Sequence, residues 1–145
     1  MRVDFYQLGG SQSDGVIASI ASRLIDEGQR LLIVAADENQ LARLDRQLWD
    51  QGAASFIPHG LAGGSEDQSQ PILLSTGTDA PNLARNMLIA DGEWRDAALG
   101  YDRAFYLFDA ATLEGARLAW KLLAGREGVD RNYWALEDGR WTKKA

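Results

Sequence analysis

Short apolar runs alternate along this chain with longer stretches in which apolar residues recur at helical spacing. Residues 3–8 form the first apolar run and predict a strand. Residues 14–27 carry apolar side chains at helical spacing, and Gly28 is a suitable end for that helix. Residues 30–36 are almost wholly apolar, as in a parallel strand that is covered on both faces.

A second helix is predicted directly after this run. Asp37 is a suitable N-cap, and Gln40, three residues later, completes the pattern of a capping box. Leu41, Leu44 and Leu48 recur at helical spacing and predict its buried stripe. Strand, helix, strand and helix in this order predict an α/β sheet.

The rest of the chain continues the alternation less regularly. Strands are predicted at residues 71–75, 86–89, 104–108 and 132–136, a helix at 112–124, a polar loop at 63–70 and a hairpin turn at 137–139. A chain of 145 residues has the usual size of one domain. We therefore predict a single domain over residues 1–145, a Rossmann-like three-layer α/β sandwich with a mostly parallel central sheet and helices on both faces.

The composition indicates the cellular compartment of such a domain. The chain has no cysteine, which excludes disulfides and thiolate metal sites and fits a cytoplasmic protein. No apolar run approaches the roughly 18 residues that a membrane span needs, and the first residues lack the apolar core of a signal peptide. We expect a cytoplasmic protein without membrane contact.

Charge is unevenly distributed. The net charge is −6, but residues 1–100 carry 7 basic and 14 acidic side chains whereas residues 101–145 carry 8 basic and 7 acidic ones. Binding to duplex DNA requires clustered Lys and Arg to neutralise phosphates. We therefore expect no direct contact with nucleic acid, although the last third of the chain could hold an acidic peptide.

Glycines after the first strand raise the possibility of a nucleotide cofactor. Gly9, Gly10 and Gly15 follow the strand, and Asp37 closes the second one, but the spacing differs from the G-x-G-x-x-G fingerprint that brings backbone amides onto a pyrophosphate. The chain also lacks a G-x-x-x-x-G-K-[ST] loop. We predict no cofactor. A small nucleotide- or dinucleotide-binding enzyme that uses the Gly9–Gly15 turn stays as the alternative.

His59 is the single histidine and the first candidate for catalysis. A general base would need an orienting carboxylate and a nearby nucleophile, and Ser55 lies outside any nucleophile-elbow pattern. A catalytic zinc site usually draws on several imidazoles. We predict no catalytic and no metal-binding residues, and a structural role for His59 through bonds to the backbone.

The last predicted helix carries the strongest candidate site. Arg117, Trp120 and Lys121 stand at i, i+3 and i+4, so two cations flank one indole. The indole also belongs to an apolar stripe with Leu113 and Leu123, which favours a buried Trp120 between two solvated cations. The alternative is a peptide-binding rim, in which the aromatic ring forms a wall and the cations donate to a carboxylate.

One loop combines bulky apolar groups with a proline and glycines. It reads Ser55-Phe56-Ile57-Pro58-His59-Gly60-Leu61-Ala62-Gly63 and follows Leu48-Trp49. With this loop, and with residues 3–6, 30–33, 37–38, 44–45, Tyr133 and Trp141, the chain resembles the chi subunit family of bacterial DNA polymerase III over nearly its whole length.

The resemblance implies a non-catalytic replisome adaptor. Members of the family bind the acidic, phenylalanine-terminated tail of single-stranded DNA-binding protein, and they bind the psi subunit, which links them to the clamp loader. The tail-binding residues of the family match Phe56, Arg117, Trp120 and Lys121. The family can have tyrosine where this chain has Trp120, so the aromatic wall is kept and a hydroxyl is lost. On this basis we expect residues 55–63 to form the other side of the pocket, with Phe56 as its aromatic floor.

Overall fold

The computed structural model describes residues 1–9, 13–50, 57–137 and 140–145, with the backbone alone at residues 13 and 14. In chain order the elements are β1 (Arg2–Gln7), α1 (Ser13–Asp26), β2 (Leu31–Val34), α2 (Glu38–Trp49), β3 (His59–Leu61), the short 3-10 helix η1 (Asp67–Ser69), β4 (Ile72–Ser75), β5 (Asn86–Ile89), η2 (Asp96–Gly100), β6 (Arg103–Phe108), η3 (Ala110–Thr112), α3 (Leu113–Ala124), β7 (Asp130–Glu137) and β8 (Arg140–Lys143). Within these ranges no helix is long and apolar enough to cross a lipid bilayer.

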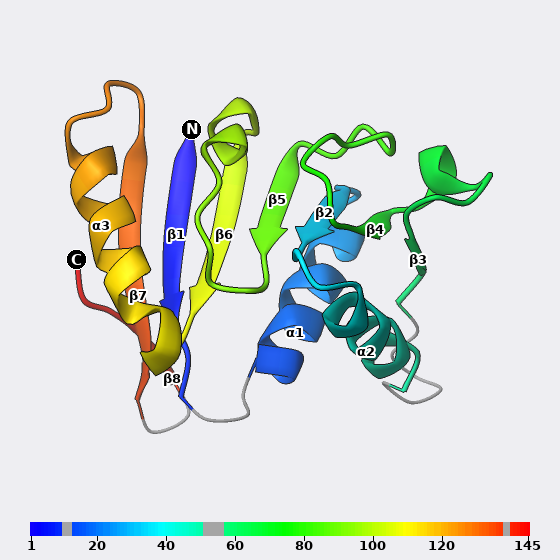
Figure 1. Ribbon diagram of the computed structural model, residues 1–145, viewed down its shortest axis with the longest axis horizontal. Helices are drawn as coiled ribbons and strands as arrows, with labels where there is room; N and C mark the ends of the chain where they lie inside the picture. Colours follow the sequence, from blue (N-terminus) through cyan, green and yellow to red (C-terminus); the bar gives the residue numbers. More distant parts are fainter. Residues whose placement is uncertain (10–12, 51–56, 138–139) are drawn as a thin grey trace.

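The strands form one sheet in the order β3-β4-β2-β5-β6-β1-β7-β8. Neighbouring strands are parallel except β7 and β8, which run antiparallel with Glu137 opposite Arg140. Figure 1 shows the consequence: β3 lies at one edge of the sheet beside α2, and β7 lies near the other edge beside α3.

Alternate residues of each strand pack on opposite faces of the sheet. Tyr6 and Ile33 belong to the apolar core under α1 and α2, whereas their neighbours Phe5 and Leu32 belong to the core under α3. This is the two-residue periodicity of a strand that is covered on both faces. The predicted α/β sandwich with a mostly parallel central sheet is therefore confirmed.

The ends of the first two helices follow from local chemistry. Gly28 ends α1 in the left-handed region, with φ +70°, and its N–H donates to the carbonyl oxygen of Ile25 over 3.0 Å. Asp37 caps α2 by accepting the Asn39 N–H over 2.8 Å. The predicted capping box is wrong in its second half, because Gln40 Nε2 donates instead to the Ala90 carbonyl oxygen over 3.0 Å and ties α2 to the end of β5.

Two differences from the predicted elements lie at the edges of the sheet. His59–Leu61, predicted as part of a loop, is the edge strand β3, a short strand whose pattern is interrupted by Gly60. Near the other edge β7 is longer than predicted, because Asp130 and Arg131 pair with β1 and Glu137 pairs with Arg140 of β8. The last residues also pair with it: the Tyr133 N–H donates to the Ala145 carbonyl oxygen and the Lys144 N–H donates to that of Tyr133. Pairing with distant segments determines both elements, so local periodicity could not predict them.

Candidate peptide-binding site

Helix α3 begins at a well-formed cap and presents two different surfaces. Asp109 accepts the Thr112 N–H over 3.2 Å, and Thr112 Oγ1 accepts the Asp109 N–H over 3.0 Å, which closes a capping box just before the helix. Ala116, Ala119 and Leu123 are buried against the sheet. The flank toward β7 carries the three residues singled out in the sequence.

A pocket of about 300 Å³ lies between this flank and the end of the chain. Its lining consists of Leu113, Ala116, Arg117, Trp120, Lys121, Tyr133, Lys144 and Ala145, and the exposed surface of its walls is almost wholly apolar. We call it the α3 pocket. It brings Arg117, Trp120 and Lys121 together and adds Tyr133 and Lys144. Sequence reasoning missed these two as site residues, because only the pairing of β7 with the last residues places them there.

Trp120 is half-buried and held from several sides. Its ring meets those of Phe5 and Tyr133 edge to face, with centroids 5.1 and 5.8 Å apart. The Arg131 guanidinium lies 3.9 Å from the indole centroid and donates to the Trp120 carbonyl oxygen over 2.7 Å. The two interpretations of Trp120 are therefore compatible: one part of the ring is core and another part lines the pocket.

Tyr133 forms the facing wall. Its hydroxyl donates to Gln7 Oε1, and its ring packs on Phe108 with centroids 5.7 Å apart. Burial raises the pKa of Tyr133, while the nearby Arg117 lowers it. The phenol is therefore neutral at ordinary pH and adds no charge to the apolar wall.

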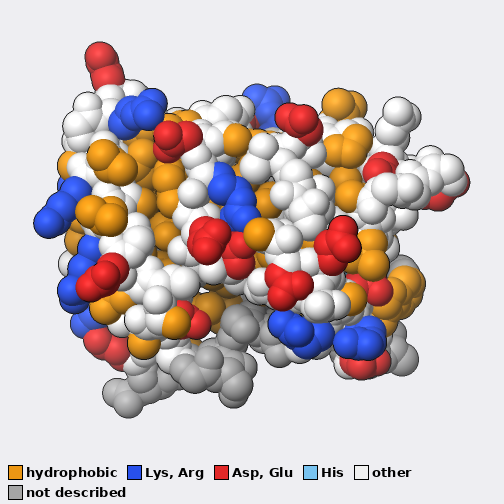
Figure 2. All heavy atoms as spheres, in the orientation of Figure 1, with side chains coloured by type: hydrophobic (Ala, Val, Ile, Leu, Met, Phe, Trp, Pro, Cys, Tyr) orange, Lys and Arg blue, Asp and Glu red, His pale blue; other side chains and the backbone are white. Residues whose placement is uncertain are grey.

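Cations surround the mouth of this pocket. Arg117 and Lys121 are exposed, and within the described ranges no carboxylate lies within ion-pair distance of either. Lys144 is paired with Glu137. Figure 2 shows basic side chains along the edge of the molecule where α3 lies. An apolar pocket with unpaired cations at its mouth suits a ligand that joins an apolar group to a carboxylate.

The loop at residues 55–63 does not border the α3 pocket where it is described. Phe56 lies outside the described residues. Residues 57–63 include β3, and five strands separate β3 from β7. The expectation that this loop forms the other side of the pocket is wrong for its described part, because the order of strands in a parallel sheet cannot be deduced from the sequence alone.

His59 makes the contacts to the backbone that were predicted for it. Its side chain is buried; Nδ1 lies 2.7 Å from the Ile57 carbonyl oxygen, and Nε2 lies 3.0 Å from both the carbonyl oxygen and Oδ1 of Asp45. The ring also packs on Trp49, with centroids 4.7 Å apart. These contacts connect α2 to β3.

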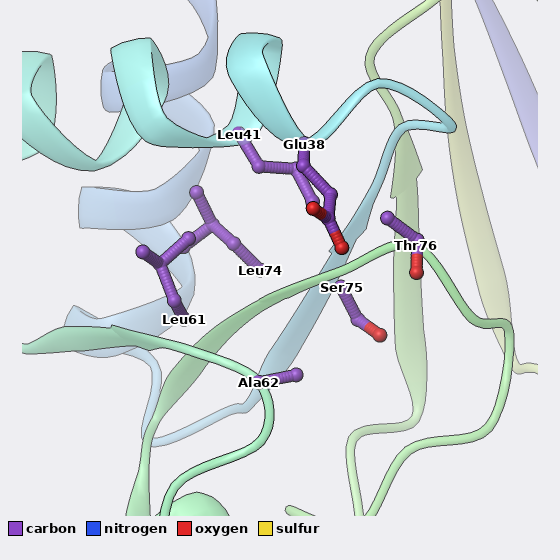
Figure 3. Close-up of a pocket in the computed structure, with 7 residues that line it drawn as sticks. All are labelled: Glu38, Leu41, Leu61, Ala62, Leu74, Ser75 and Thr76. Carbon is purple, nitrogen blue, oxygen red and sulfur yellow. The ribbon is translucent and has the colours of Figure 1, made fainter.

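A second hollow, of about 240 Å³, lies where parallel α/β sheets usually bind ligands, at the carboxyl ends of β3 and β4 beside the start of α2. Figure 3 shows its lining, with Glu38 above Ser75 and Thr76. An acidic side chain occupies the helix start where a phosphate would bind, and the described residues of the lining include no cation. Residues 10–12 of the alternative Gly9–Gly15 turn lie outside the described residues. Elsewhere in the described chain, no cluster of three potential metal ligands occurs.

Comparison with known proteins shows the family of this chain. Residues 1–130 match the family model of the DNA polymerase III chi subunit, HolC, and the chain belongs to this family. DNA polymerase III subunit chi of Escherichia coli is 34% identical over 82 residues, which cover 57% of this chain and 56% of that protein. The subunit of the same name from Pseudomonas aeruginosa is 34% identical over 91 residues, covering 61% and 62%. The matches thus span less than two thirds of these relatives.

A solved structure shares the architecture without sharing the sequence. The C-terminal domain of Dbp5 from S. cerevisiae superposes with a TM-score of 0.61 over 90% of this chain and 88% of that one, at 11% identity. At this identity the likeness shows the fold alone.

Proposed function

We propose that this chain is a non-catalytic accessory subunit of a bacterial DNA polymerase III holoenzyme that works in DNA replication. In this role the α3 pocket holds the acidic, phenylalanine-terminated tail of single-stranded DNA-binding protein, and the psi subunit links the chain to the clamp loader. Family membership supports the setting. The observation that carries the tail-binding role is the apolar pocket with Arg117 and Lys121 unpaired at its mouth.

The geometry suggests how the tail binds. Its terminal phenyl ring enters the α3 pocket between Trp120 and Tyr133, and its α-carboxylate accepts hydrogen bonds from Arg117 and Lys121. Burial of the ring contributes about 1.5–3 kcal/mol, whereas each exposed charge pair contributes less than about 1 kcal/mol. We expect micromolar affinity, which weakens as added salt screens the charges.

Calorimetric titration of the tail peptide, with and without its last phenylalanine, tests this mechanism. We expect the complete peptide to bind at about micromolar Kd and the truncated one at least about tenfold more weakly, because the buried ring is lost. Equal binding of both peptides, or no binding of either, would refute the mechanism.

The link to the psi subunit is proposed on family membership alone. Size-exclusion chromatography of the chain mixed with a bacterial psi subunit tests it, with the Arg117→Glu variant as the control. We expect co-elution with both the parent and the variant. Separate elution of the parent chain and psi would contradict the link, while the tail titration would be unaffected.

A further inference from the structure

Two hollows adjoin at Arg2 and Arg103: the larger lies at the amino ends of β1, β2, β5 and β6, and the smaller lies on the α1 face of the sheet, between α1, β1 and β7. The larger one measures about 790 Å³ and the smaller about 290 Å³, and Arg2 and Arg103 line both. Arg30 and Arg85 line the larger hollow and Arg23 lines the smaller one. We call the two hollows together the arginine groove.

The buried carboxylate of Asp4 lies at the centre of the arginine groove. Arg2 and Arg103 face each other in the β1–β6 register, and both bind Asp4, which is fully buried. Arg2 Nε lies 3.0 Å and Arg103 Nη2 lies 2.8 Å from Asp4 Oδ2. Trp134 Nε1 donates to Oδ1 of the same carboxylate over 3.1 Å. Two guanidinium groups share one carboxylate, so the centre keeps a positive charge.

The outer arginines add to this charge. The Arg30 guanidinium donates to the carbonyl oxygens of Gln68 and Asn82 over 3.0 and 2.8 Å. In the part of the chain that the structure describes, no carboxylate lies within ion-pair distance of Arg23 or Arg30.

The local charge has the opposite sign to that of the whole chain. Arg85 is paired with Asp102 at 2.6 Å, and Glu27 also lines the larger hollow. Five arginines therefore accompany three carboxylates, those of Asp4, Glu27 and Asp102, which leaves a balance of +2 in a chain of net charge −6.

Aromatic rings line the smaller hollow beside the arginines. Tyr6, Trp134 and Trp141 contribute to its wall, and the rings of Tyr6 and Trp141 meet edge to face at 5.0 Å. Both tryptophans are half-buried, so part of each ring stays accessible.

Leu83, on the wall of the larger hollow, is strained and exposed at the same time. Its φ is +60°, which costs a leucine about 1–2 kcal/mol. Its side chain is 79% exposed, so the side chain gains little from burial in return. Strain of this kind is typical of sites where a side chain is held out for a partner.

We propose that the arginine groove binds single-stranded nucleic acid. Guanidinium groups along a groove bind successive phosphates, and neighbouring aromatic rings stack on bases, which is how proteins hold single strands without reading sequence. Leu83 adds an apolar contact to a sugar or base. The acidic chain as a whole repels polyanions, so the complex is weak, and it is sensitive to salt.

Fluorescence anisotropy with a labelled oligothymidylate of about 16 nucleotides tests the assignment. If about three phosphates are neutralised, the affinity should fall about 20-fold as salt rises from about 50 to about 200 mM. No binding at the lower salt concentration would overturn the proposal. Displacement of the oligonucleotide by an equimolar acidic peptide would also overturn it, because the groove would then be a peptide surface.

A matched pair of charge reversals locates the binding. Arg23→Glu removes an arginine of the groove from α1, and Arg43→Glu makes the same charge change at an exposed position of α2. We expect Arg23→Glu to weaken oligonucleotide binding about fivefold and to reduce the salt slope by about 0.7, as for one lost phosphate contact. Arg43→Glu should change the affinity less than about twofold. Equal effects of the two variants would overturn the assignment.

Leu83→Asn separates function from folding. Asparagine tolerates the left-handed conformation better than leucine, so the variant should unfold at the same or higher denaturant concentration than the parent. Its affinity for the oligonucleotide should fall about twofold to threefold, because an apolar contact is lost. Unchanged affinity in both Leu83→Asn and Arg23→Glu would contradict the proposal.

Discussion

The α3 pocket and the arginine groove both combine cations with aromatic rings, but they hold their charges differently. In the α3 pocket, Arg117 and Lys121 are unpaired beside an apolar hollow of about 300 Å³. In the groove, Arg2 and Arg103 are fixed by Asp4 between two hollows. An apolar pocket suits one anchor with one carboxylate, whereas a row of fixed guanidinium groups suits a long polyanion.

The α3 pocket and the smaller hollow of the groove lie on opposite faces of the sheet, so the two regions are separable. Tyr133 lines the α3 pocket and its neighbour Trp134 lines the groove, because successive residues of a strand point to opposite faces. Variants in one region should therefore leave ligand binding by the other unchanged.

Alkaline pH should lower the folding stability of the protein through Tyr106, which lies in the core under α3. Burial raises the pKa of Tyr106 to about 12, and its hydroxyl donates to the Gly92 carbonyl oxygen over 2.7 Å. An unfolded tyrosine loses its proton near pH 10. The stabilisation is thus fully present below about pH 10 and is lost between about pH 10 and 12, at a cost of about 2–3 kcal/mol.

Denaturant unfolding measured between pH 9 and 12 checks this expectation, with Tyr106→Phe as the control. The variant should begin about 1 kcal/mol less stable, because the Gly92 carbonyl oxygen loses its donor. It should then lack the part of the alkaline loss that belongs to Tyr106. An equally steep loss in the variant would show that other groups cause it.

Arg117→Glu should weaken binding of the tail by the α3 pocket and leave binding of the oligonucleotide by the groove almost unchanged. Loss of the exposed charge pair and the like-charge repulsion that replaces it each cost up to about 1 kcal/mol, so tail affinity should fall by up to about 30-fold in calorimetric titrations. Oligonucleotide affinity should change less than about twofold. Arg43→Glu provides the same change of net charge at an exposed residue that lines neither region. If Arg43→Glu weakened tail binding as much, a general electrostatic effect would replace the clamp.

Trp120→Tyr should have the smallest effect. Tyrosine keeps an aromatic wall between Phe5 and Tyr133, so tail affinity should stay within about threefold of the parent. Trp120→Leu is the control that keeps bulk and removes the ring. If Trp120→Leu bound the tail as well as Trp120→Tyr, the aromatic character of the wall would be irrelevant.

Local sequence patterns predicted most of the fold and the α3 side of the α3 pocket. The alternating apolar runs predicted the sandwich, and helical spacing brought Arg117, Trp120 and Lys121 to one flank of α3. Tyr133 and Lys144 enter the pocket only through pairing of the last residues with β7, a contact that leaves no periodic signal. The loop around His59 gave the strongest resemblance, yet its described part lies at the far edge of the sheet.

The arginine groove shows a further limit of sequence reasoning. Its members Arg2, Arg23 and Arg103 come from three separate elements, and their charges disappear in an acidic average. Only the parallel register of β1 and β6 brings Arg2 and Arg103 onto the same carboxylate. Net charge is informative about long-range attraction but says little about a local patch.

The chain's 5 tryptophans offer the most direct test of the tail-binding claim. In a ¹⁵N-correlation spectrum each indole N–H gives one resonance, assignable with single Trp→Phe variants. On titration with the complete tail peptide, the resonance of Trp120 should move while those of Trp134 and Trp141 in the groove stay in place. Movement of the Trp134 and Trp141 resonances with Trp120 unchanged would contradict the account.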